Sequence, residues 1–535
     1  MPTLEWIGKD KVINHHQEVP YRILDKKYTY NAESSENMII HGDNLLALKS
    51  LLPQYEGKVD CIYIDPPYNT GNEKWVYNDN VNDPKIKKWL GEVVGQEGED
   101  LSRHDKWLCM MYPRMRLLYL LLKETGLFLV SVDDNELFYV KLLLDEIFGK
   151  NNFIANCVVK RSTNGMGDRK GFSNNHDYVI CYQKDESAFF YGLFPSEEYI
   201  NSFNKTDQYG RYKIDGILMK KGAGSLRTDV PTLYFPLYYS NESGEVSLTP
   251  KQGFIEKYPI KSNGVEGRWT WSKTKIQNEN YRLYASSNGT IYIKDYLTSE
   301  RRQKPKTILD STKYLTNIAT NEIKDIFDDK LFDTPKPVGF IKDLIDNCAP
   351  TNGIILDSFS GSGTTAHAVL DLNRQDGGNR KFILVEMMDY ADTITAERVK
   401  RVIDGYGEGN KAVEGLGGDF GYYELGAPLF NEDKNINEEI GEAEIRKYVY
   451  YMETKLPLET NADDNRYYMG KANDTAYYFY YEKDKPTTLN REFLSTVKTK
   501  ASGYLIYADV CALPKETLDK NGIVFKKIPR DIKKL

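Results

Sequence analysis

The stretch DCIYIDPPYNTG, residues 60–71, runs from β-favouring apolar residues directly into an acid, two prolines and an aromatic ring. The apolar run at 61–64 predicts a buried strand. Pro66 and Pro67 end this strand, because neither has an N–H to donate to a β-ladder. We therefore expect Asp65 and Tyr68 at the carboxyl end of a strand, which is where open α/β sheets bind their ligands.

Strand and helix signals alternate on both sides of this stretch. Further strands are predicted at 37–43, 126–134, 153–161 and 177–184, and helices at 44–52, 104–126 (with a kink at Pro113) and 135–149. The alternation stops in a polar, turn-rich region and then returns, with helices at 337–349 and 364–373 and strands at 353–359 and 381–387. This order predicts an α/β domain with a mostly parallel sheet, interrupted by an insertion.

The chain accordingly divides into four predicted regions. The first half of the α/β domain covers 1–184, the insertion 185–325 and the second half 326–430. The last region, 431–535, ends in strand, helix and strand signals, which predict a small α/β domain.

Composition limits the class of protein. The 535 residues are 40% hydrophobic and 28% charged, which is typical of a soluble globular protein. No signal peptide and no apolar run of about 20 residues is visible, so we expect a cytoplasmic protein without membrane contact. The six cysteines are scattered, which favours reduced thiols and predicts no metal site. A net charge of −7 does not exclude nucleic-acid binding, because a basic cleft can lie on an acidic body.

A glycine-rich loop, DSFSGSGTTAHAVL (357–370), lies between a predicted strand and helix. Gly361, Gly363 and Ala366 fit the pattern G-x-G-x-x-A, and Glu386 ends the next strand. Glycines let a ligand approach the backbone, and a carboxylate at that place can bind both hydroxyls of a ribose. The pattern alone fits NAD, FAD or S-adenosylmethionine (AdoMet), or a tight turn with no ligand. The absence of GKS or GKT after the loop disfavours a Walker-type ATPase.

The corner at Asp65 favours AdoMet among these ligands. The carboxylate of Asp65 and the carbonyl of Pro66 can accept both N–H hydrogens of a planar amino group while its ring stacks on Tyr68. Two such acceptors favour pyramidalisation of the nitrogen and expose its lone pair to an electrophilic methyl group. Asp65 would then stabilise the developing positive charge, and the proton would leave after methyl transfer. The alternative is a Pro-Pro pair that only ends a strand.

Seven segments together resemble a known family, the β class of DNA amino-methyltransferases, and most closely the modification (Mod) subunits of type III restriction–modification systems. The resemblance covers most of residues 30–430 and rests on IIHGDNLLAL (39–48), YIDPPYNTGN (63–72), GLFLVSVDDNE (126–136), HDYVICY (176–182), FDTPKPVGFIKDLI (332–345), DSFSGSGTTAHAV (357–369) and FILVEMMDY (382–390).

The resemblance implies a Rossmann-like AdoMet-dependent methyltransferase fold with a mixed, mostly parallel sheet in permuted order, interrupted by a target-recognition domain. It implies that the target base is held by Asp65, Pro66, Pro67 and Tyr68. It also implies that AdoMet lies against Asp43, Lys336, Asp357, Phe359, Gly361, Gly363, Thr364 and Glu386, with Asp43 near the adenine, Glu386 on the ribose and Lys336 in a motif that closes over the cofactor. An initial Asp rather than Ser in this corner is the family pattern for adenine N6 over cytosine N4.

The implied substrate is double-stranded DNA, from which the base must be extruded. The candidate DNA contacts combine cations with one aromatic ring: Lys160, Arg161, Arg169 and Lys170 between two strands, and Arg268, Trp269, Arg301 and Arg302 in the insertion. By family analogy we expect a homodimer, with a C-terminal domain that serves dimerisation or docks a restriction subunit.

Several alternatives stay open. A solitary or regulatory DNA methyltransferase would use the same chemistry, as would a cytosine-N4 enzyme. Related corners methylate RNA bases or protein glutamine. A dinucleotide oxidoreductase would use the glycine loop but leaves DPPY (65–68) without a role.

Overall fold

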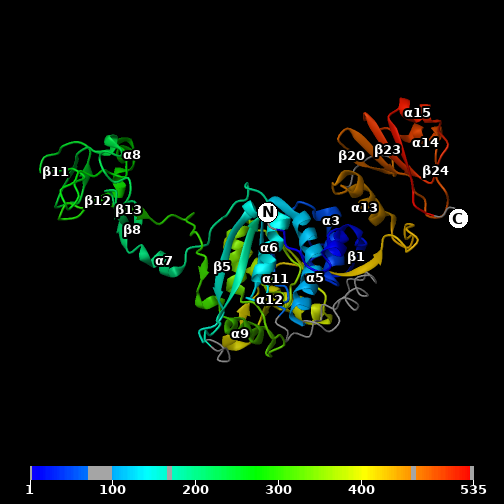
Figure 1. The fold of residues 1–535 in the computed structure, drawn as a ribbon, viewed down its shortest axis with the longest axis horizontal. Helices are drawn as coiled ribbons and strands as arrows, with labels where there is room; N and C mark the ends of the chain where they lie inside the picture. Colours follow the sequence, from blue (N-terminus) through cyan, green and yellow to red (C-terminus); the bar gives the residue numbers. More distant parts are fainter. Residues whose placement is uncertain (1–2, 70–98, 165–170, 460–464, 531–535) are drawn as a thin grey trace. The chain divides into compact units, whose positions relative to one another are not determined.

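The computed structural model describes residues 3–69, 99–164, 171–459 and 465–530. By its internal contacts the chain separates into two units. The first consists of Met1–Gly192 together with Pro305–Leu535, and the second is Leu193–Lys304. The two units are described in turn, with their elements labelled as in Figure 1.

The first unit is built on a ten-stranded sheet in its described part. The order across the sheet is β1 (Arg22–Tyr30), β19 (Phe420–Pro428), β2 (Met38–His41), β16 (Lys381–Glu386), β15 (Ile354–Asp357), β3 (Val59–Ile64), β4 (Leu122–Val132), β6 (His176–Gln183), β5 (Phe153–Lys160) and β14 (Ile308–Leu309). The pairs β1–β19, β4–β6 and β5–β6 are antiparallel, and the other neighbours are parallel. The prediction of a mixed, mostly parallel sheet in permuted order is therefore confirmed.

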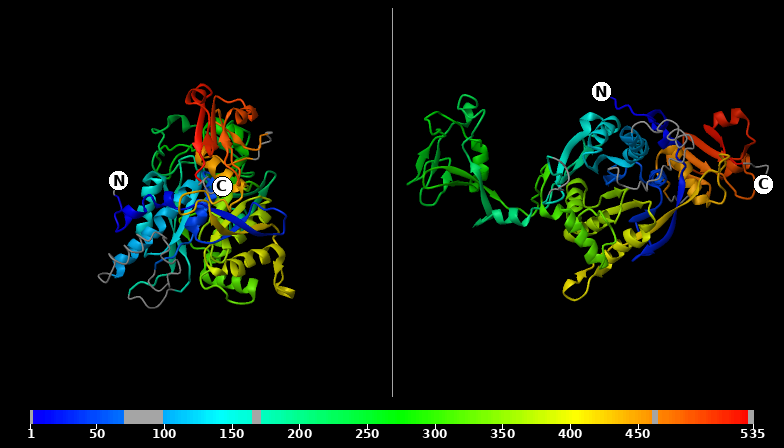
Figure 2. Two further views of the ribbon diagram at one scale, coloured as in Figure 1. Left: turned by 90° about the vertical axis from the view of Figure 1, so that its right-hand side faces the viewer. Right: turned by 60° about the horizontal axis from the view of Figure 1, so that its bottom comes forward.

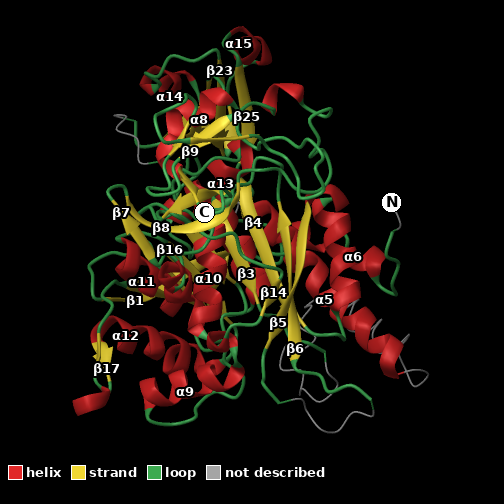
Figure 3. Ribbon diagram, turned by 90° about the vertical axis from the view of Figure 1, so that its left-hand side faces the viewer, coloured by secondary structure: helices red, strands yellow, loops and turns green. Residues whose placement is uncertain are grey.

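Helices cover both faces of this sheet (Figure 3). On one face α3 (Asn44–Tyr55), α5 (Glu99–Leu121) and α6 (Leu137–Phe148) enclose a core that includes Ile62, Trp107 and Val130, all fully buried. On the other face α10 (Val338–Cys348) contacts β3, and α11 (Thr364–Asp376) contacts β16. The peripheral elements are α1 (Lys9–Val12), α2 (His15–Glu18), α9 (Thr316–Phe327), α12 (Glu397–Asp404), β17 (Gly405–Tyr406) and β18 (Val413–Glu414).

Two sequence-based predictions differ from the observed elements. The helix predicted at 104–126 ends at Leu121, where β4 begins, and α5 continues through Pro113. Its buried neighbours Tyr112, Met115 and Leu118 hold the helix against the sheet, which offsets the hydrogen bond that proline cannot donate. Strands β1 and β19 were not predicted. β1 is half-buried and rich in charge, and β19 mixes tyrosine with glycine and proline, so both lack the apolar run that marks the inner strands.

The second unit, Leu193–Lys304, has two small antiparallel sheets of its own (green in Figure 2). One has the order β12 (Leu283–Ala285), β13 (Ile291–Tyr296), β8 (Gly210–Ile217), β7 (Lys205–Asp207), and the other β10 (Val246–Ser247), β9 (Leu237–Tyr239), β11 (Ile255–Lys257). Helix α8 (Lys273–Glu279) and the tryptophans Trp269 and Trp271 contribute to its separate core, and α7 (Glu197–Ser202) precedes the first strand.

The ends of this unit pair with each other. The N–H of Leu193 donates to the carbonyl of Gln303 at 2.8 Å, and the N–H of Gln303 donates back at 2.9 Å. The unit lies inside the insertion predicted at 185–325, but it is narrower, because β14 and α9 belong by their contacts to the first unit.

The C-terminal part of the first unit carries a separate small sheet. Its order is β20 (Tyr468–Ala472), β21 (Thr475–Phe479), β23 (Gly503–Ala508), β25 (Ile523–Lys527), and the last three strands are parallel. Helices α13 (Glu442–Thr454), α14 (Arg491–Thr496) and α15 (Lys515–Lys520) accompany it, with the short pair β22 (Thr488–Leu489) and β24 (Val510–Cys511). The strand–helix–strand signals at the end of the sequence correspond to β23, α15 and β25.

The corner that follows β3 is anchored from behind by the buried side chain of Glu136. Its Oε1 accepts hydrogen bonds from Asn69 Nδ2 at 2.5 Å and from His104 Nδ1 at 2.7 Å. Trp107 Nε1 donates to the carbonyl of Pro67 at 2.8 Å. Because Glu136 is fully buried, these hydrogen bonds are shielded from water and fix the path of residues 65–69.

We expect Glu136→Ala to lower the free energy of unfolding by about 2–4 kcal/mol, because it removes the buried carboxylate that accepts hydrogen bonds from Asn69 and His104. Urea denaturation of the full chain measures this loss. The matched control is Glu414→Ala, which breaks a surface pair with Arg374 at 3.2 Å and should cost less than about 1 kcal/mol. Equal losses in the two variants would contradict the anchoring role.

Candidate active site

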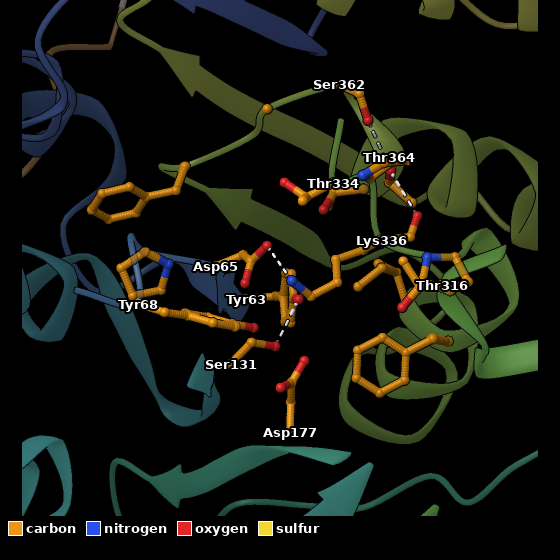
Figure 4. A pocket seen from close by; sticks show the side chains of 18 of the residues that line it. Tyr63, Asp65, Tyr68, Ser131, Asp177, Thr316, Thr334, Lys336, Ser362 and Thr364 are labelled. Atoms are coloured by element: carbon orange, nitrogen blue, oxygen red, sulfur yellow. Dashed lines mark hydrogen bonds and ion pairs between the residues drawn. The ribbon is translucent and has the colours of Figure 1, made fainter. Parts of the chain in front are cut away.

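A cavity of about 940 Å³ opens at the carboxyl ends of β3, β4, β15 and β16. Its lining comes from both halves of the α/β domain and includes the corner after β3, the loop after β15 and residues 334–337 before α10 (Figure 4). Among the residues predicted for the base and the cofactor, those that line the cavity are Asp65, Pro66, Pro67, Tyr68, Lys336, Asp357, Phe359, Gly361, Thr364 and Glu386. The parallel sheet thus brings together the two motifs that the sequence singled out.

The glycine loop leaves no room for larger side chains. Gly361 has φ +50°, and a Cβ there would lie 3.2 Å from Phe332 Cζ. Gly363 has φ +79°, and its Cβ would lie 3.1 Å from the carbonyl oxygen of Thr395. Both positions therefore need glycine for backbone conformation as well as for space. Gly363 precedes the first residue of α11 and is not among the described residues that line the cavity.

Glu386 closes this loop against the sheet. Its carboxylate accepts the N–H of Gly361 at 2.8 Å and the N–H of Met388 at 3.0 Å. Burial raises the pKa of Glu386 to about 7, and the two N–H groups act in the opposite direction because they favour the ionised form. The N–H of Met387 and the hydroxyl of Tyr390 favour the ionised form as well, so Glu386 is a buried, well hydrogen-bonded acid at the edge of the cavity.

Asp357 is the first residue of the glycine-rich segment, and its side chain stabilises the residues that follow. Its two oxygens accept the N–H of Phe359 at 3.1 Å and the hydroxyl of Thr365 at 2.5 Å. Burial raises its pKa to about 7. The side chain that the resemblance grouped with the cofactor ligands is therefore engaged in holding the loop.

Asp43 lies elsewhere. Its carboxylate is the N-cap of α3, where it accepts the N–H of Leu45 at 2.8 Å, and it forms an ion pair with Arg114 at 3.4 Å. Asp43 is not among the described residues that line the cavity. Its expected contact with the adenine of the cofactor remains a prediction.

The corner at Asp65 faces a lysine. Asp65 Oδ2 lies 2.5 Å from Lys336 Nζ, and the ammonium lies 5.1 Å from the centroid of the Tyr68 ring. Asp65 Oδ1 is buried and has no hydrogen-bond partner among the described residues. Burial, followed by the charge of Asp65, raises the pKa of Tyr68 well above its usual value, so its hydroxyl stays neutral.

Several cavity residues lie outside the predicted set, and three of them, Tyr63, Ser131 and Asp177, surround the corner at Asp65. Tyr63 and Ser131 share a hydrogen bond of 2.8 Å (Figure 4). Asp177 forms an ion pair with Arg161 at 3.3 Å. Ser131 and Asp177 belong to GLFLVSVDDNE and HDYVICY, two motifs to which the resemblance assigns no role. Ser131 lies near the end of β4, which pairs with β3, and Asp177 lies at the start of β6, which runs antiparallel to β4. Both therefore lie at the edge of the sheet where β3 ends, which is the signal that could have identified them.

The structure places the candidate DNA contacts in different settings. Arg161 lines the cavity, Lys160 ends β5, and Arg169 and Lys170 lie outside the described residues. Trp269 is 2% exposed and donates to the carbonyl of Phe235 at 2.9 Å, so the expectation that it touches DNA is corrected: it belongs to the core.

The arginines of the insertion are engaged within their own unit. Arg301 forms a bidentate pair with Asp295 at 2.8 and 2.7 Å, Arg302 lies over the Phe194 ring at 3.7 Å, and Arg268 Nε donates to Gly224 O at 2.5 Å. Arg301 is therefore half of a neutral pair rather than a free cation.

Of the described residues, no group of three or more His, Cys, Asp or Glu could hold a metal ion. Within the same ranges no helix has the length and apolar character to cross a membrane.

Comparison with known proteins agrees with the geometry of the cavity. The family model for DNA methylases, N6_N4_Mtase, matches residues 59–397. The chain is 42% identical over 354 residues to the type II methyltransferase M.KpnI of Klebsiella pneumoniae, which is 66% of this chain and 81% of that protein. It is 35% identical over 416 residues to the Mod subunit of the type III restriction–modification enzyme EcoPI of Escherichia phage P1, which is 72% of this chain and 63% of that protein.

The match therefore spans somewhat less than two thirds of that Mod subunit. Among solved structures, PvuII DNA methyltransferase (cytosine-N4-specific) matches with a TM-score of 0.34 and 13% identity, over 68% of this chain and 87% of that one. That score is too low to add to what the sheet order shows. The family match covers more than half of the sequence and both motifs of the cavity, and the chain belongs to the DNA methylase family N6_N4_Mtase.

Proposed function

We propose that this DNA methylase transfers a methyl group from AdoMet to N6 of an adenine that has been rotated out of double-stranded DNA. The observation that carries the proposal is the single cavity shared by Asp65 and the glycine loop. A methyl donor on the loop and an amino group on Asp65 would meet within it. Such a base must leave the duplex first, at a cost of about a few kcal/mol.

The residues around the glycine loop fit AdoMet. Gly361 and Gly363 keep the loop backbone bare, Phe359 offers an apolar surface, and the Glu386 carboxylate lines the cavity at the place where this pattern puts the ribose hydroxyls. When bound, AdoMet supplies an electrophilic methyl group on a cationic sulfur. Asp65, Asp177 and Glu386 line the cavity together with the cations Arg161 and Lys336, so charges of both signs surround the bound cofactor.

The residues of the corner would orient the base and stabilise charge. Asp65 and the carbonyl of Pro66 accept the two N–H hydrogens of the amino group, and the Tyr68 ring stacks on the purine. The amino nitrogen becomes positively charged as it is methylated, and the Asp65 carboxylate opposes that charge in a partly dry site. The proton then leaves to solvent, because Asp65 is too weak a base to remove it beforehand.

Within restriction–modification systems two assignments are proposed. In the first, the chain is the Mod subunit of a type III system, acts as a homodimer and pairs with a restriction subunit. The similarity to the EcoPI Mod subunit over 72% of the chain supports it. In the second, it is a solitary methyltransferase, which the 42% identity to the type II enzyme M.KpnI favours. A helicase–nuclease reading frame beside the gene would favour the first.

Base-resolution sequencing of DNA from a methylation-free host tests the activity. Cells that express the wild-type chain should carry N6-methyladenine in one recurring sequence. Asp65→Ala should lower methylation by at least about 100-fold, because it removes the acceptor that opposes the developing charge. AdoMet affinity, measured by calorimetry, should change less than about twofold, since Asp65 lies across the cavity from the loop.

The control is Asp185→Ala, an exposed acid on the same unit, which should methylate as the wild type does. Methylation at cytosine N4 would refute the adenine assignment, and full activity of Asp65→Ala would refute the role of the corner.

AdoMet binding should depend on pH through Glu386. Burial raises the pKa of Glu386 to about 7, so Glu386 is fully ionised only above that pH. The ionised carboxylate is the form that would accept the two ribose hydroxyls. Below about pH 7 the protonated acid loses acceptor capacity, so the dissociation constant should rise by up to about tenfold per pH unit. Calorimetry between pH 5.5 and 8.5 measures this. Glu386→Gln should bind more weakly with a flatter profile; a wild-type profile without slope would exclude the contact.

The second unit, Leu193–Lys304, is proposed to read the target sequence. It has its own core, and its ends meet at the paired Leu193 and Gln303, so it can be exchanged without changing the sheet of the first unit. A chimera that carries the corresponding unit of a relative should methylate a different sequence, while AdoMet affinity stays the same. Sequencing of cellular DNA measures the change. An unaltered target in an active chimera would assign recognition to the first unit.

A further inference from the structure

Lys336 connects the two halves of the cavity. It lies between Pro335 and Pro337, which stiffen its backbone, and its carbonyl accepts the hydroxyl of Thr364 at 3.1 Å from the glycine-loop side. From this fixed point its side chain crosses the cavity to Asp65 (Figure 4). The backbone position and the ammonium therefore belong to opposite sides of the site.

The ammonium makes the contacts that a target amino group would need. It donates to Asp65 Oδ2 at 2.5 Å and lies 5.1 Å from the centre of the Tyr68 ring. Both side chains of the pair are only 22–23% exposed. An N–H donor on this carboxylate, next to this ring, is also what the proposed chemistry requires of the adenine.

We propose that Lys336 is an internal competitor of the target base: its ammonium occupies the place of the amino group, and the base engages Asp65 only after Lys336 has moved away. The inference rests on the proposed function. Two physical reasons require the movement. The ammonium lies 5.1 Å from the centroid of the Tyr68 ring, on which the purine would stack, so the ammonium and the base compete for that position. An ammonium on Asp65 would also repel the positive charge that develops on the methylated nitrogen.

Asp177 is the group that can receive the displaced ammonium. It lines the same cavity, and its carboxylate points toward the Lys336 side chain in Figure 4. Burial raises the pKa of Asp177, and the charges of Arg161 and Lys336 act against that rise, so an additional nearby cation would stabilise its ionised form. Because the Lys336 backbone is fixed, only the four-carbon side chain has to rotate.

This exchange would set a threshold for base entry. Before DNA binds, Lys336 prevents Asp65 from standing as a bare, partly buried charge. An entering group must then compensate for the lost ion pair. A purine with an exocyclic amine can do so through both N–H hydrogens and stacking on Tyr68, whereas thymine, which lacks an amino group, cannot.

The test measures base extrusion without AdoMet. The probe is a duplex with the sequence found by methylation mapping and 2-aminopurine beside the target adenine, which brightens when its neighbour leaves the stack. Lys336→Met, which keeps length but removes charge, should give at least a threefold larger increase in fluorescence than the wild type. Lys336→Arg, which keeps the charge and donor, should resemble the wild type. In an Asp65→Ala background Lys336→Met should add nothing.

A second uncharged variant and the methylation map separate a failure of this inference from a failure of the proposed function. Lys336→Gln, which keeps an amide donor without charge, should also brighten more than the wild type, and melting temperatures check that each variant is folded. If the fluorescence increase in Lys336→Met and Lys336→Gln is no larger than in the wild type, the inference is overturned. The proposed function still stands in that case, provided that the wild-type methylation map shows methylated adenine. Absence of any methylated site in the wild-type map would overturn both.

Discussion

The parallel pairing of β3 with β15 is the contact on which the cavity depends. Ile354 N donates to Asp60 Oδ2 at 2.9 Å, although the two residues are 294 positions apart in the chain. Cys61 and Ile62 pair with Ile355 and Leu356 in the same ladder. Because parallel strands end at one edge of a sheet, the loop that follows each strand has to open on the same side. A stiff corner with an acid and a bare glycine loop thereby become neighbours.

Much of this arrangement could be predicted from local sequence. Apolar runs identified the inner strands, and Glu386 was found by its spacing from the glycine loop. The strands β1 and β19 could not be found in this way, because their burial depends on each other and leaves no periodic pattern. Asp43 has the residue type and position of an N-cap, which local rules can recognise, so its observed role was available from the sequence.

The remaining features needed three-dimensional information. Nothing in EGRWTWSKTK (266–275) distinguishes a tryptophan that stacks on DNA from one that fills a core, and the hydrogen bond of Trp269 with Phe235 decides for the core. The contact between Lys336 and Asp65 joins segments 271 positions apart. TPKP (334–337) could be placed beside a cofactor by resemblance, but the direction of its lysine depends on how two halves of a sheet meet.

The two hydrogen bonds that join Leu193 and Gln303, at the ends of the second unit, have an evolutionary consequence. A segment that leaves and re-enters a fold through adjacent residues, and that carries its own hydrophobic core, can be replaced by recombination in one event. Such a replacement needs no compensating mutation in the strands that hold the chemistry. If the second unit reads the target as proposed, one such replacement would change the methylated sequence and leave the methyl-transfer site as it was.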